Sequence, residues 1–291
     1  MRPFTYLRPT SLDQMMTALA DPDASAALLA GGTDLIVRLR RGHLRPAMVV
    51  DTKSVRDLNG DIIAIDGGLR FGARVTMTAL IEDARVRDRF EALGEAASVV
   101  GSVQIRNRAT LAGNVCNASP AADTVPALLV YGARVNVAGP AGSRVVRLAE
   151  FFTGPGRTVL TRGELVASID LPFPATLAGA SFGRITRRRG VDLATINLCG
   201  LITSEGDARF AFGAVGPTPF MRVDRTGALA AGATDTAARD SALRTMCAAA
   251  RPITDVRGSR EYRTAMLAVM TGRAWKVAEA RLRGRMGTRP A

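Results

Sequence analysis

The sequence is poor in the residues that build metal centres and disulfide frameworks. Its 291 residues include three cysteines and one histidine. The cysteines, Cys116, Cys199 and Cys247, are far apart and show no C-x-x-C spacing, which argues against a cysteine metal cage or a disulfide framework. His43 has no nearby pattern of metal ligands or triad partners, so we assign it no catalytic role. Any iron–sulfur cluster that works with this chain must belong to another chain.

Long apolar runs are also missing. Hydrophobic residues make up 47% of the chain, yet no run approaches the ~20 residues that a membrane-spanning helix needs. The first residues lack the apolar stretch of a secretory signal and are soon followed by Asp13 and Asp21. We therefore expect a cytoplasmic globular protein with no membrane association.

Lysine and aromatic residues are scarce, although the net charge is +13. Two of the 39 basic residues are lysines and the rest are scattered arginines, while aromatics make up 5%. This pattern lacks the alternation of stacking rings and cations that single-strand nucleic-acid binders use. We expect no nucleic-acid binding, and the excess charge fits acidic partner subunits or an anionic cofactor better.

Hydrophobic periodicity predicts an α+β protein with several lobes, because single domains usually hold ~100–150 residues. Pro172-Phe173-Pro174 interrupts the pattern and marks a boundary. The tail from Gly284 has no periodicity and is expected to fray. The patterns predict helices over 11–20, 78–88, 126–131, 235–250 and 258–283, and strands over 26–30, 47–51, 62–65, 69–72, 134–137, 144–146, 165–171, 180–187, 193–203 and 208–215.

Two glycine-bearing segments carry the candidate chemistry. In the first, Leu29 and Ala30 end an apolar run, Gly31 and Gly32 form a turn, and residues 33–35 open a capped helix. Paired glycines let the main chain approach a ligand, and free amides at such a turn suit a phosphate. By itself, however, such a glycine turn is also common between a strand and a helix in proteins that bind no ligand there.

The second segment, residues 104–123, is a long stretch of small and amide side chains in an otherwise aliphatic protein. Thr110, Asn114, Asn117 and Ser119 offer hydroxyl and amide hydrogen bonds, and Asp123 offers a carboxylate acceptor. This inventory matches a ligand that carries phosphates and several hydroxyls.

Together the two segments resemble motifs of the FAD-binding medium subunits of molybdenum hydroxylases, the family of xanthine dehydrogenase and carbon monoxide dehydrogenase. Ala112-Gly113 stands where the family usually has Gly-Gly, and the four-cysteine insertion of some relatives is absent. Further segments that resemble the family are 49–51, 104–107, 213–219 and 252–258.

The resemblance implies an α+β fold with an FAD-binding domain of the vanillyl-alcohol-oxidase (PCMH) type. It would comprise a first lobe, residues 1–58, and a second lobe, residues 59–173. The third lobe, residues 174–291, would be a domain of the carbon monoxide dehydrogenase flavoprotein C-terminal type, with a three-stranded antiparallel sheet and helices.

The resemblance also implies the cofactor contacts, with no catalytic or metal-binding residue on this chain. Residues at the pyrophosphate would be Ala30, Gly31, Gly32, Thr33, Asp34 and Leu35, and Leu29 before them would also belong to the cofactor site. The phosphate and ribityl groups would meet Thr110, Gly113, Asn114 and Asn117, with Asp123 at a ribityl or flavin polar group. Leu165 and Val166 would press on the flavin ring, and Arg184 would lie beside its edge.

The implied function is electron transfer. A small iron–sulfur subunit with [2Fe-2S] clusters would pass electrons to FAD on this chain, and NAD, a quinone or oxygen would accept them. A large molybdopterin subunit would oxidise the substrate, in a heterotrimer or a dimer of it. Two alternatives remain open: a self-sufficient FAD oxidoreductase, or a basic assembly protein without flavin. Arg187, Arg188 and Arg189 form a candidate interface.

Overall fold

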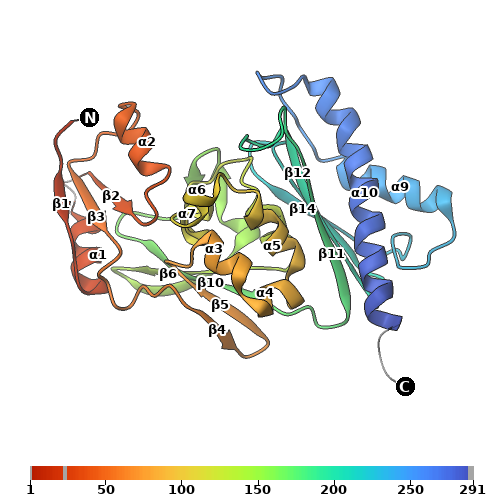
Figure 1. The fold of residues 1–291 in the computed structure, drawn as a ribbon, viewed down its shortest axis with the longest axis horizontal. Helices are drawn as coiled ribbons and strands as arrows, with labels where there is room; N and C mark the ends of the chain where they lie inside the picture. The colour runs from red at the N-terminus through yellow and green to blue at the C-terminus, as the bar shows by residue number, and fades with distance from the viewer. Residues whose placement is uncertain (1, 22–24, 288–291) are drawn as a thin grey trace.

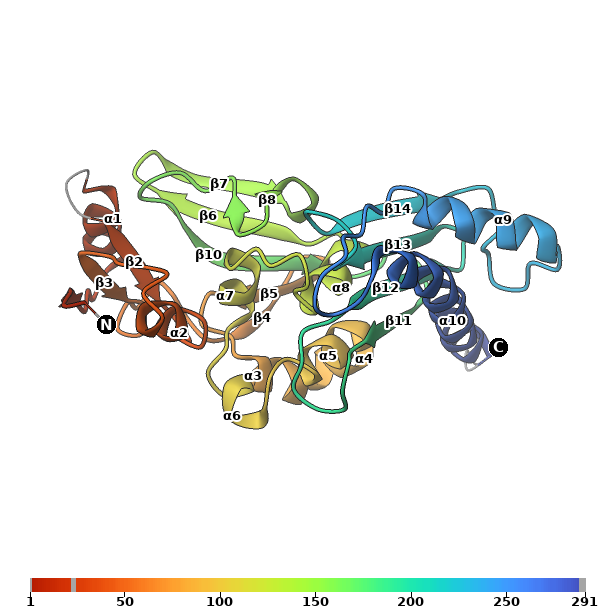
Figure 2. The same ribbon diagram turned by 90° about the horizontal axis from the view of Figure 1, so that it is seen from above.

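The computed structural model describes residues 2–21 and 25–287. Among the described residues, the three sheets that have three or more strands follow one another along the long axis of the molecule, in chain order (Figure 1). The first lobe lies at one end, the second lobe in the middle, and the third lobe with the C-terminal helix at the other end, as the view from above also shows (Figure 2). The lobe boundaries at residues 58 and 173 stay predictions.

The first lobe is a small parallel sheet with two helices. Strand β3 pairs in parallel with both neighbours, in the order β1-β3-β2. Ser11 caps the first helix, since its side chain accepts a hydrogen bond from the Gln14 N–H. The elements are β1 (Thr5–Leu7), α1 (Leu12–Ala20), β2 (Ala26–Leu29), α2 (Leu35–Arg40) and β3 (Met48–Asp51).

The second lobe is built on a five-stranded antiparallel sheet in the order β4-β5-β10-β6-β7. Its last strand, β10, lies in the middle and closes the lobe. The strands are β4 (Ile62–Ile65), β5 (Gly68–Gly72), β6 (Arg134–Gly139), β7 (Gly142–Arg147) and β10 (Leu165–Pro172), with η1 (Leu148–Glu150) and the short pair β8 (Phe152–Gly154) and β9 (Arg157–Thr158) between them.

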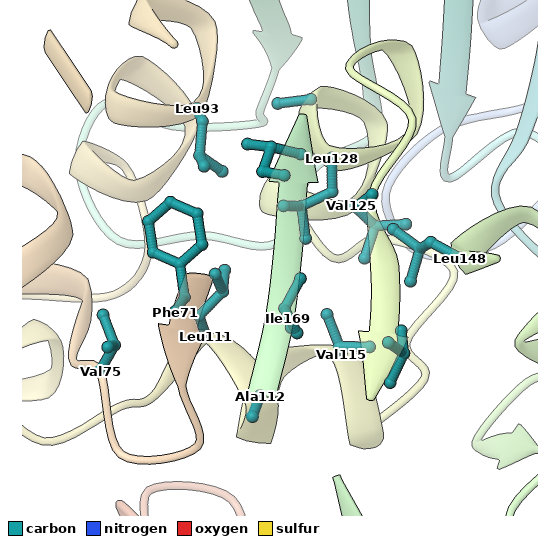
Figure 3. Close-up of a cluster of buried hydrophobic side chains, with 14 of the residues drawn as sticks. Phe71, Val75, Leu93, Leu111, Ala112, Val115, Val125, Leu128, Leu148 and Ile169 are labelled. Atoms are coloured by element: carbon teal, nitrogen blue, oxygen red, sulfur yellow. The ribbon is translucent and has the colours of Figure 1, made fainter. Parts of the chain in front are cut away.

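Six helices accompany this sheet, and all of them except the one over residues 103–106 contribute buried side chains to the core. Figure 3 shows Phe71 of β5, Ile169 of β10 and Leu128 of α8 among the packed side chains. The helices are α3 (Met77–Glu82), α4 (Ala84–Arg89), α5 (Glu91–Ser98), α6 (Val103–Arg106), α7 (Leu111–Cys116) and α8 (Thr124–Val130).

One segment of this lobe that the sequence predicted as a single helix forms two helices. The pattern over 78–88 predicted a continuous helix, but Asp83 is extended and its carboxylate accepts from the Arg85 and Val86 N–H groups. This cap starts α4 and therefore ends α3.

The third lobe has four antiparallel strands, in the order β11-β12-β13-β14, where the sequence predicted three. The missed strand follows a Pro-rich turn and lies at the sheet edge with exposed Arg222 and Val223, so its apolar pattern is weak. The elements are β11 (Ala178–Ile185), β12 (Ile196–Thr203), β13 (Ala208–Gly213), β14 (Phe220–Asp224), α9 (Thr236–Cys247) and α10 (Arg260–Gly287).

The final helix is longer than predicted. The expected fraying from Gly284 is wrong for residues 284–287, which continue α10, and residues 288–291 lie outside the described part of the chain. Arg285 in this stretch contacts Glu91 of α5, so a tertiary contact holds a segment that has no apolar periodicity of its own.

The third sheet shares its core with the second lobe. All eight residues of β12 are buried, which is typical of a strand covered on both faces. Cys199 and Leu201 pack into the core of the second lobe, whereas Leu198 and Ile202 pack under α10. The third lobe is therefore joined to the second by a continuous apolar interior, with α10 on the outer face (Figure 1).

Candidate cofactor site

A cavity of about 660 Å³ lies where the three lobes meet. The first lobe lines it between Ala27 and Leu35, the second between Ala109 and Asp123, and the third between Arg188 and Leu193. Thirteen of the predicted cofactor residues are on its wall: Ala30, Gly31, Gly32, Thr33, Asp34, Leu35, Thr110, Gly113, Asn114, Asn117, Asp123, Leu165 and Val166.

The glycine turn is positioned by a close crossing of two segments. A Cβ on Gly31 would lie 2.0 Å from the Arg108 carbonyl oxygen, and Gly32 has a φ of +79°. Any larger residue at Gly31 would push the two main chains apart. Within the described part of the chain, the backbone N–H groups of residues 31–34 donate no hydrogen bond. They form a set of free donors on the cavity wall, which suits an anionic group.

Asp34 stands at the N-cap position of α2 without capping the helix. Its side chain makes no capping hydrogen bond and lines the cavity instead. Burial raises the pKa of its carboxyl, and the nearby Arg38 guanidinium opposes that rise. Arg38 also lines the cavity and forms no salt bridge with any described residue. Sequence reasoning missed Arg38, although its position four residues after Asp34 puts both side chains on one helix face.

The opposite wall is formed by α7, whose start is fixed by Thr110. The Thr110 hydroxyl accepts a hydrogen bond from the Gly113 N–H at 3.0 Å, while Thr110 and Thr76 form an isolated β-bridge. A Cβ on Gly113 would lie 2.7 Å from that hydroxyl. The glycine therefore leaves room for the cap, and Ala112 next to it lines the cavity without a second glycine.

Two asparagines give this wall its hydrogen-bonding character. Asn114 Oδ1 accepts from the Thr124 hydroxyl at 2.7 Å, which orients the amide. Among the described residues, Asn114 Nδ2 and the Asn117 side chain have no hydrogen-bond partner, and both residues line the cavity. These groups are available to a ligand that carries phosphates or hydroxyls.

Asp123 lines the cavity, and both oxygens of its carboxylate accept hydrogen bonds from other residues of this chain. Oδ2 accepts from Arg184 Nη1 at 2.9 Å, and Oδ1 accepts from Asn197 Nδ2 at 2.9 Å. Arg184 itself does not reach the cavity wall and stands behind Asp123. Leu29 is also outside the wall, between Leu28 and Ala30, which are in it.

The remaining wall is apolar. Leu165 and Val166, both buried, start β10 beneath the cavity. Cys116 also lines the cavity, and burial raises the pKa of its thiol to about 12. The thiol is therefore protonated near neutral pH.

Several other wall residues gave no sequence signal, because their proximity depends on how the lobes pack. Among them, Ile105 and Arg188 belonged to segments that the sequence singled out, without being predicted as cofactor contacts. They are Leu44, Thr52, Leu58, Ala73, Val100, Gly101, Ile105, Arg188, Val191, Asp192 and Leu193.

The wall as a whole fits an extended dinucleotide such as FAD. Free main-chain amides and Arg38 gather at one place, amide side chains face them, and an apolar floor begins at β10. The described residues contain no group of His, Cys, Asp or Glu that could hold a metal ion. No described helix is long and apolar enough to cross a membrane.

Two family models match the chain. The FAD binding domain in molybdopterin dehydrogenase matches residues 2–174, and the CO dehydrogenase flavoprotein C-terminal domain matches residues 181–278. Together these models cover the first two lobes and most of the third.

Curated relatives match almost end to end. The xanthine dehydrogenase FAD-binding subunit of Escherichia coli O157:H7 is 33% identical over 97% of this chain and 98% of its own length. The carbon monoxide dehydrogenase medium chain of Afipia carboxidovorans is 31% identical over 96% and 97%.

Solved structures agree with the sequence matches. A chain of the Cu,Mo-CO dehydrogenase in its cyanide-inactivated form has a TM-score of 0.88 at 31% identity, covering 97% of this chain and all of that one. A chain of quinoline 2-oxidoreductase from Pseudomonas putida 86 has a TM-score of 0.87 at 28% identity, covering 96% and 98%.

Proposed function

Because the chain belongs to the family of FAD-binding medium subunits of molybdenum hydroxylases, we propose that it holds FAD across the cavity between its lobes and relays electrons from an iron–sulfur partner to an external acceptor. The observation that carries this proposal is the set of free N–H groups at residues 31–34, opposite the unpartnered amides of Asn114 and Asn117.

The wall suggests how the cofactor would lie. The pyrophosphate of FAD would accept hydrogen bonds from the main-chain amides of the glycine turn, and Arg38 would offset part of its negative charge. Its ribityl hydroxyls and the phosphate would meet Asn114 and Asn117. The ring would rest on Leu165 and Val166, which exclude water from one side of it.

The bound flavin would supply the redox chemistry, whereas this chain would bind, orient and shield it. The Asp123–Arg184 pair would place a fixed negative and a fixed positive charge on the side of the third lobe. Such charges act strongly on a nearby redox group because the surroundings have few mobile dipoles.

The partners belong to the proposal as well. A small subunit with [2Fe-2S] clusters would donate electrons, and a large molybdopterin subunit would oxidise the substrate, in a cytoplasmic heterotrimer or a dimer of it. The relatives named as carbon monoxide dehydrogenase medium chains support such an assembly. Arg187 and Arg189, which are exposed and flank Arg188 of the cavity wall, remain with Arg188 candidates for contact with a partner.

The visible spectrum of the purified chain tests the cofactor claim. We expect flavin bands and about one FAD per chain, identified by chromatography after release. Asn114→Ala should weaken FAD binding by roughly tenfold, since it removes hydrogen bonds to a charged or hydroxylated ligand. Asn136→Ala is the matched control, because Asn136 bonds Ser168 away from the cavity.

Activity assays separate the two alternatives. A self-sufficient FAD oxidoreductase would turn over a small substrate without partners, whereas the proposed subunit would at most reduce a dye with an electron donor such as NADH. If the chain takes up no flavin even after incubation with FAD, the proposed function is wrong and a flavin-free assembly role gains support.

A further inference from the structure

The turn at residues 119–123, which we call the cavity turn, connects α7 with α8 and lines the cavity through Ser119, Ala121, Ala122 and Asp123. Although it belongs to the second lobe, groups of the third lobe hold it in place. The strongest contacts come from Asn197, which is fully buried in β12 and does not line the cavity.

Asn197 bonds the cavity turn at two points. Its Nδ2 donates to Asp123 Oδ1 at 2.9 Å and to the Ala121 carbonyl at 3.3 Å. Both partners are acceptors, which fixes the orientation of the amide with its nitrogen toward the turn. A single buried side chain therefore sets both the main chain and the carboxylate of the turn.

Arg184 completes the surroundings of the carboxylate. It donates to Asp123 Oδ2 at 2.9 Å, so both carboxylate oxygens accept from groups that can only donate, an arrangement that fits the ionised form. Arg184 is the charged group that faces Asp123, and the other residues of the cavity turn are uncharged. Burial raises the pKa of Asp123, and Asn197 and Arg184 oppose that rise.

A third contact is made by the end of β13. The Ala214 N–H donates to the Pro120 carbonyl at 2.7 Å, from a residue with a φ of +60°. At Gly213, a Cβ would lie 2.1 Å from Asn197 Oδ1 and 3.1 Å from the Pro120 oxygen. The absence of a side chain at Gly213 lets Asn197 and the cavity turn approach each other.

From these contacts we infer that Asn197 is a positioning residue for the cofactor site, which orients the Asp123 carboxylate at the cavity wall and keeps it ionised without touching the cavity. This inference rests on the proposed function, since it concerns how the third lobe shapes the FAD site. It assigns the third lobe a direct part in setting the charge beside the cofactor.

The first test replaces Asn197 with alanine. We expect Asn197→Ala to bind FAD roughly tenfold more weakly, because one carboxylate oxygen loses its donor and the cavity turn loses a tether. The midpoint potential of the bound flavin should shift as well. Thr203→Ala is the matched control: it removes a buried side chain at the far end of β12, where Thr203 bonds Asp207 and not the cavity turn. It should leave both quantities unchanged.

The second test is Asn197→Asp, followed from pH 5.5 to pH 9. Two facing carboxylates share one proton at low pH, and the protonated one donates as the amide did. We expect FAD affinity close to that of the unmodified chain at low pH and a progressive loss as the pH rises and the proton leaves. The unmodified chain should show no such loss over the same range.

The outcomes separate this inference from the proposed function. If the unmodified chain binds no FAD, the proposed function fails. If it binds FAD and Asn197→Ala retains its affinity and potential, the positioning role is wrong. A loss in Asn197→Asp that is the same at every pH would also overturn it, because it would indicate packing alone. Should Asn197→Ala fail to fold, as its thermal melt would show, the pH profile of Asn197→Asp decides.

Discussion

Arg285 Nη2 of α10 donates a hydrogen bond to Glu91 Oε2 of α5 at 3.0 Å, and both residues also bind the edge strand β11. Glu91 accepts from the Ala180 N–H at 3.1 Å, and Arg285 donates to the Ala178 carbonyl. The pair therefore takes the place that a neighbouring strand would occupy.

A second pair repeats this arrangement further along β11. Glu95 accepts from the Phe182 N–H at 3.1 Å and pairs with Arg281, which donates to the Ala180 carbonyl at 2.6 Å. Side chains thus satisfy successive outward main-chain groups of an edge strand that would otherwise be open to pairing with another chain. They also fasten α10 to the second lobe.

Removing both glutamates should destabilise the chain and expose this edge. We expect Glu91→Ala with Glu95→Ala to lower the free energy of unfolding by about 2–3 kcal/mol, because partly buried N–H groups and arginines lose their partners. Urea unfolding measures the loss, and sedimentation should detect self-association. Arg283→Ala removes an exposed pair with Glu279 on the same helix and should change stability by less than about 0.5 kcal/mol. Equal effects of the two changes would contradict this role of the pairs.

Gly31→Ala should abolish FAD binding. The new Cβ would lie 2.0 Å from the Arg108 carbonyl, so the glycine turn must move away from the second lobe. Titration of the apo-protein with FAD, followed by flavin fluorescence, measures the effect. Gly94→Ala is the control, since a Cβ there meets nothing within 4 Å in helix α5, and it should be neutral or stabilising by up to about 1 kcal/mol. Unchanged binding by Gly31→Ala would show that the turn is not a cofactor contact.

Arg38→Ala should weaken FAD binding by roughly tenfold at low salt, with a smaller difference at high salt, because its guanidinium acts on the phosphates through a screened charge. Stability should be unaffected, since Arg38 is exposed and forms no salt bridge with a described residue. Arg40→Ala, on the same helix but outside the cavity wall, should bind FAD normally. A salt-independent loss would assign Arg38 a packing role.

Glu164 should make the free energy of unfolding depend on pH in the acid range. Its pKa is lowered to about 2 from the model-peptide value of 4.5, chiefly by the Arg144 side chain. A carboxylate with a lowered pKa stabilises the fold above its unfolded pKa and loses that contribution as the pH falls from 4.5 towards 2. We expect Glu164→Gln to cost about 1 kcal/mol at pH 7, because the pair is partly exposed and screened.

The difference between Glu164→Gln and the unmodified chain should shrink between pH 4.5 and pH 2. Urea unfolding at pH 7, 4 and 3 measures it. Glu150→Gln removes an ion pair with Arg147 that is more exposed than the Arg144–Glu164 pair, and it should show almost no difference at any of these pH values. A constant difference across the series would rule out the ion pair as its cause.

Local features of the cofactor site follow from the sequence, because each depends on residues a few positions apart. The turn of Gly31 and Gly32 after β2 belongs to this class. The cap of α7 by Thr110 is equally local, although the sequence patterns did not predict that helix. Capping, φ preference and apolar periodicity act within about one helical turn, so they can be read without knowing the fold. The same holds for the scarcity of cysteine, which pointed any iron–sulfur cluster to another chain.

The tertiary structure alone decided how these features meet. Asn197 lies 74 residues from Asp123, and nothing in its local sequence distinguishes it from a core residue of a strand. Likewise, β14 and the end of α10 lack clear periodicity and are held by neighbours that are distant in sequence. The sequence by itself determined the family motifs, most of the elements and thirteen wall residues. The packing of three lobes determined that Asp123 faces Arg184 and Asn197, because long-range contacts depend on which faces the folded chain buries together.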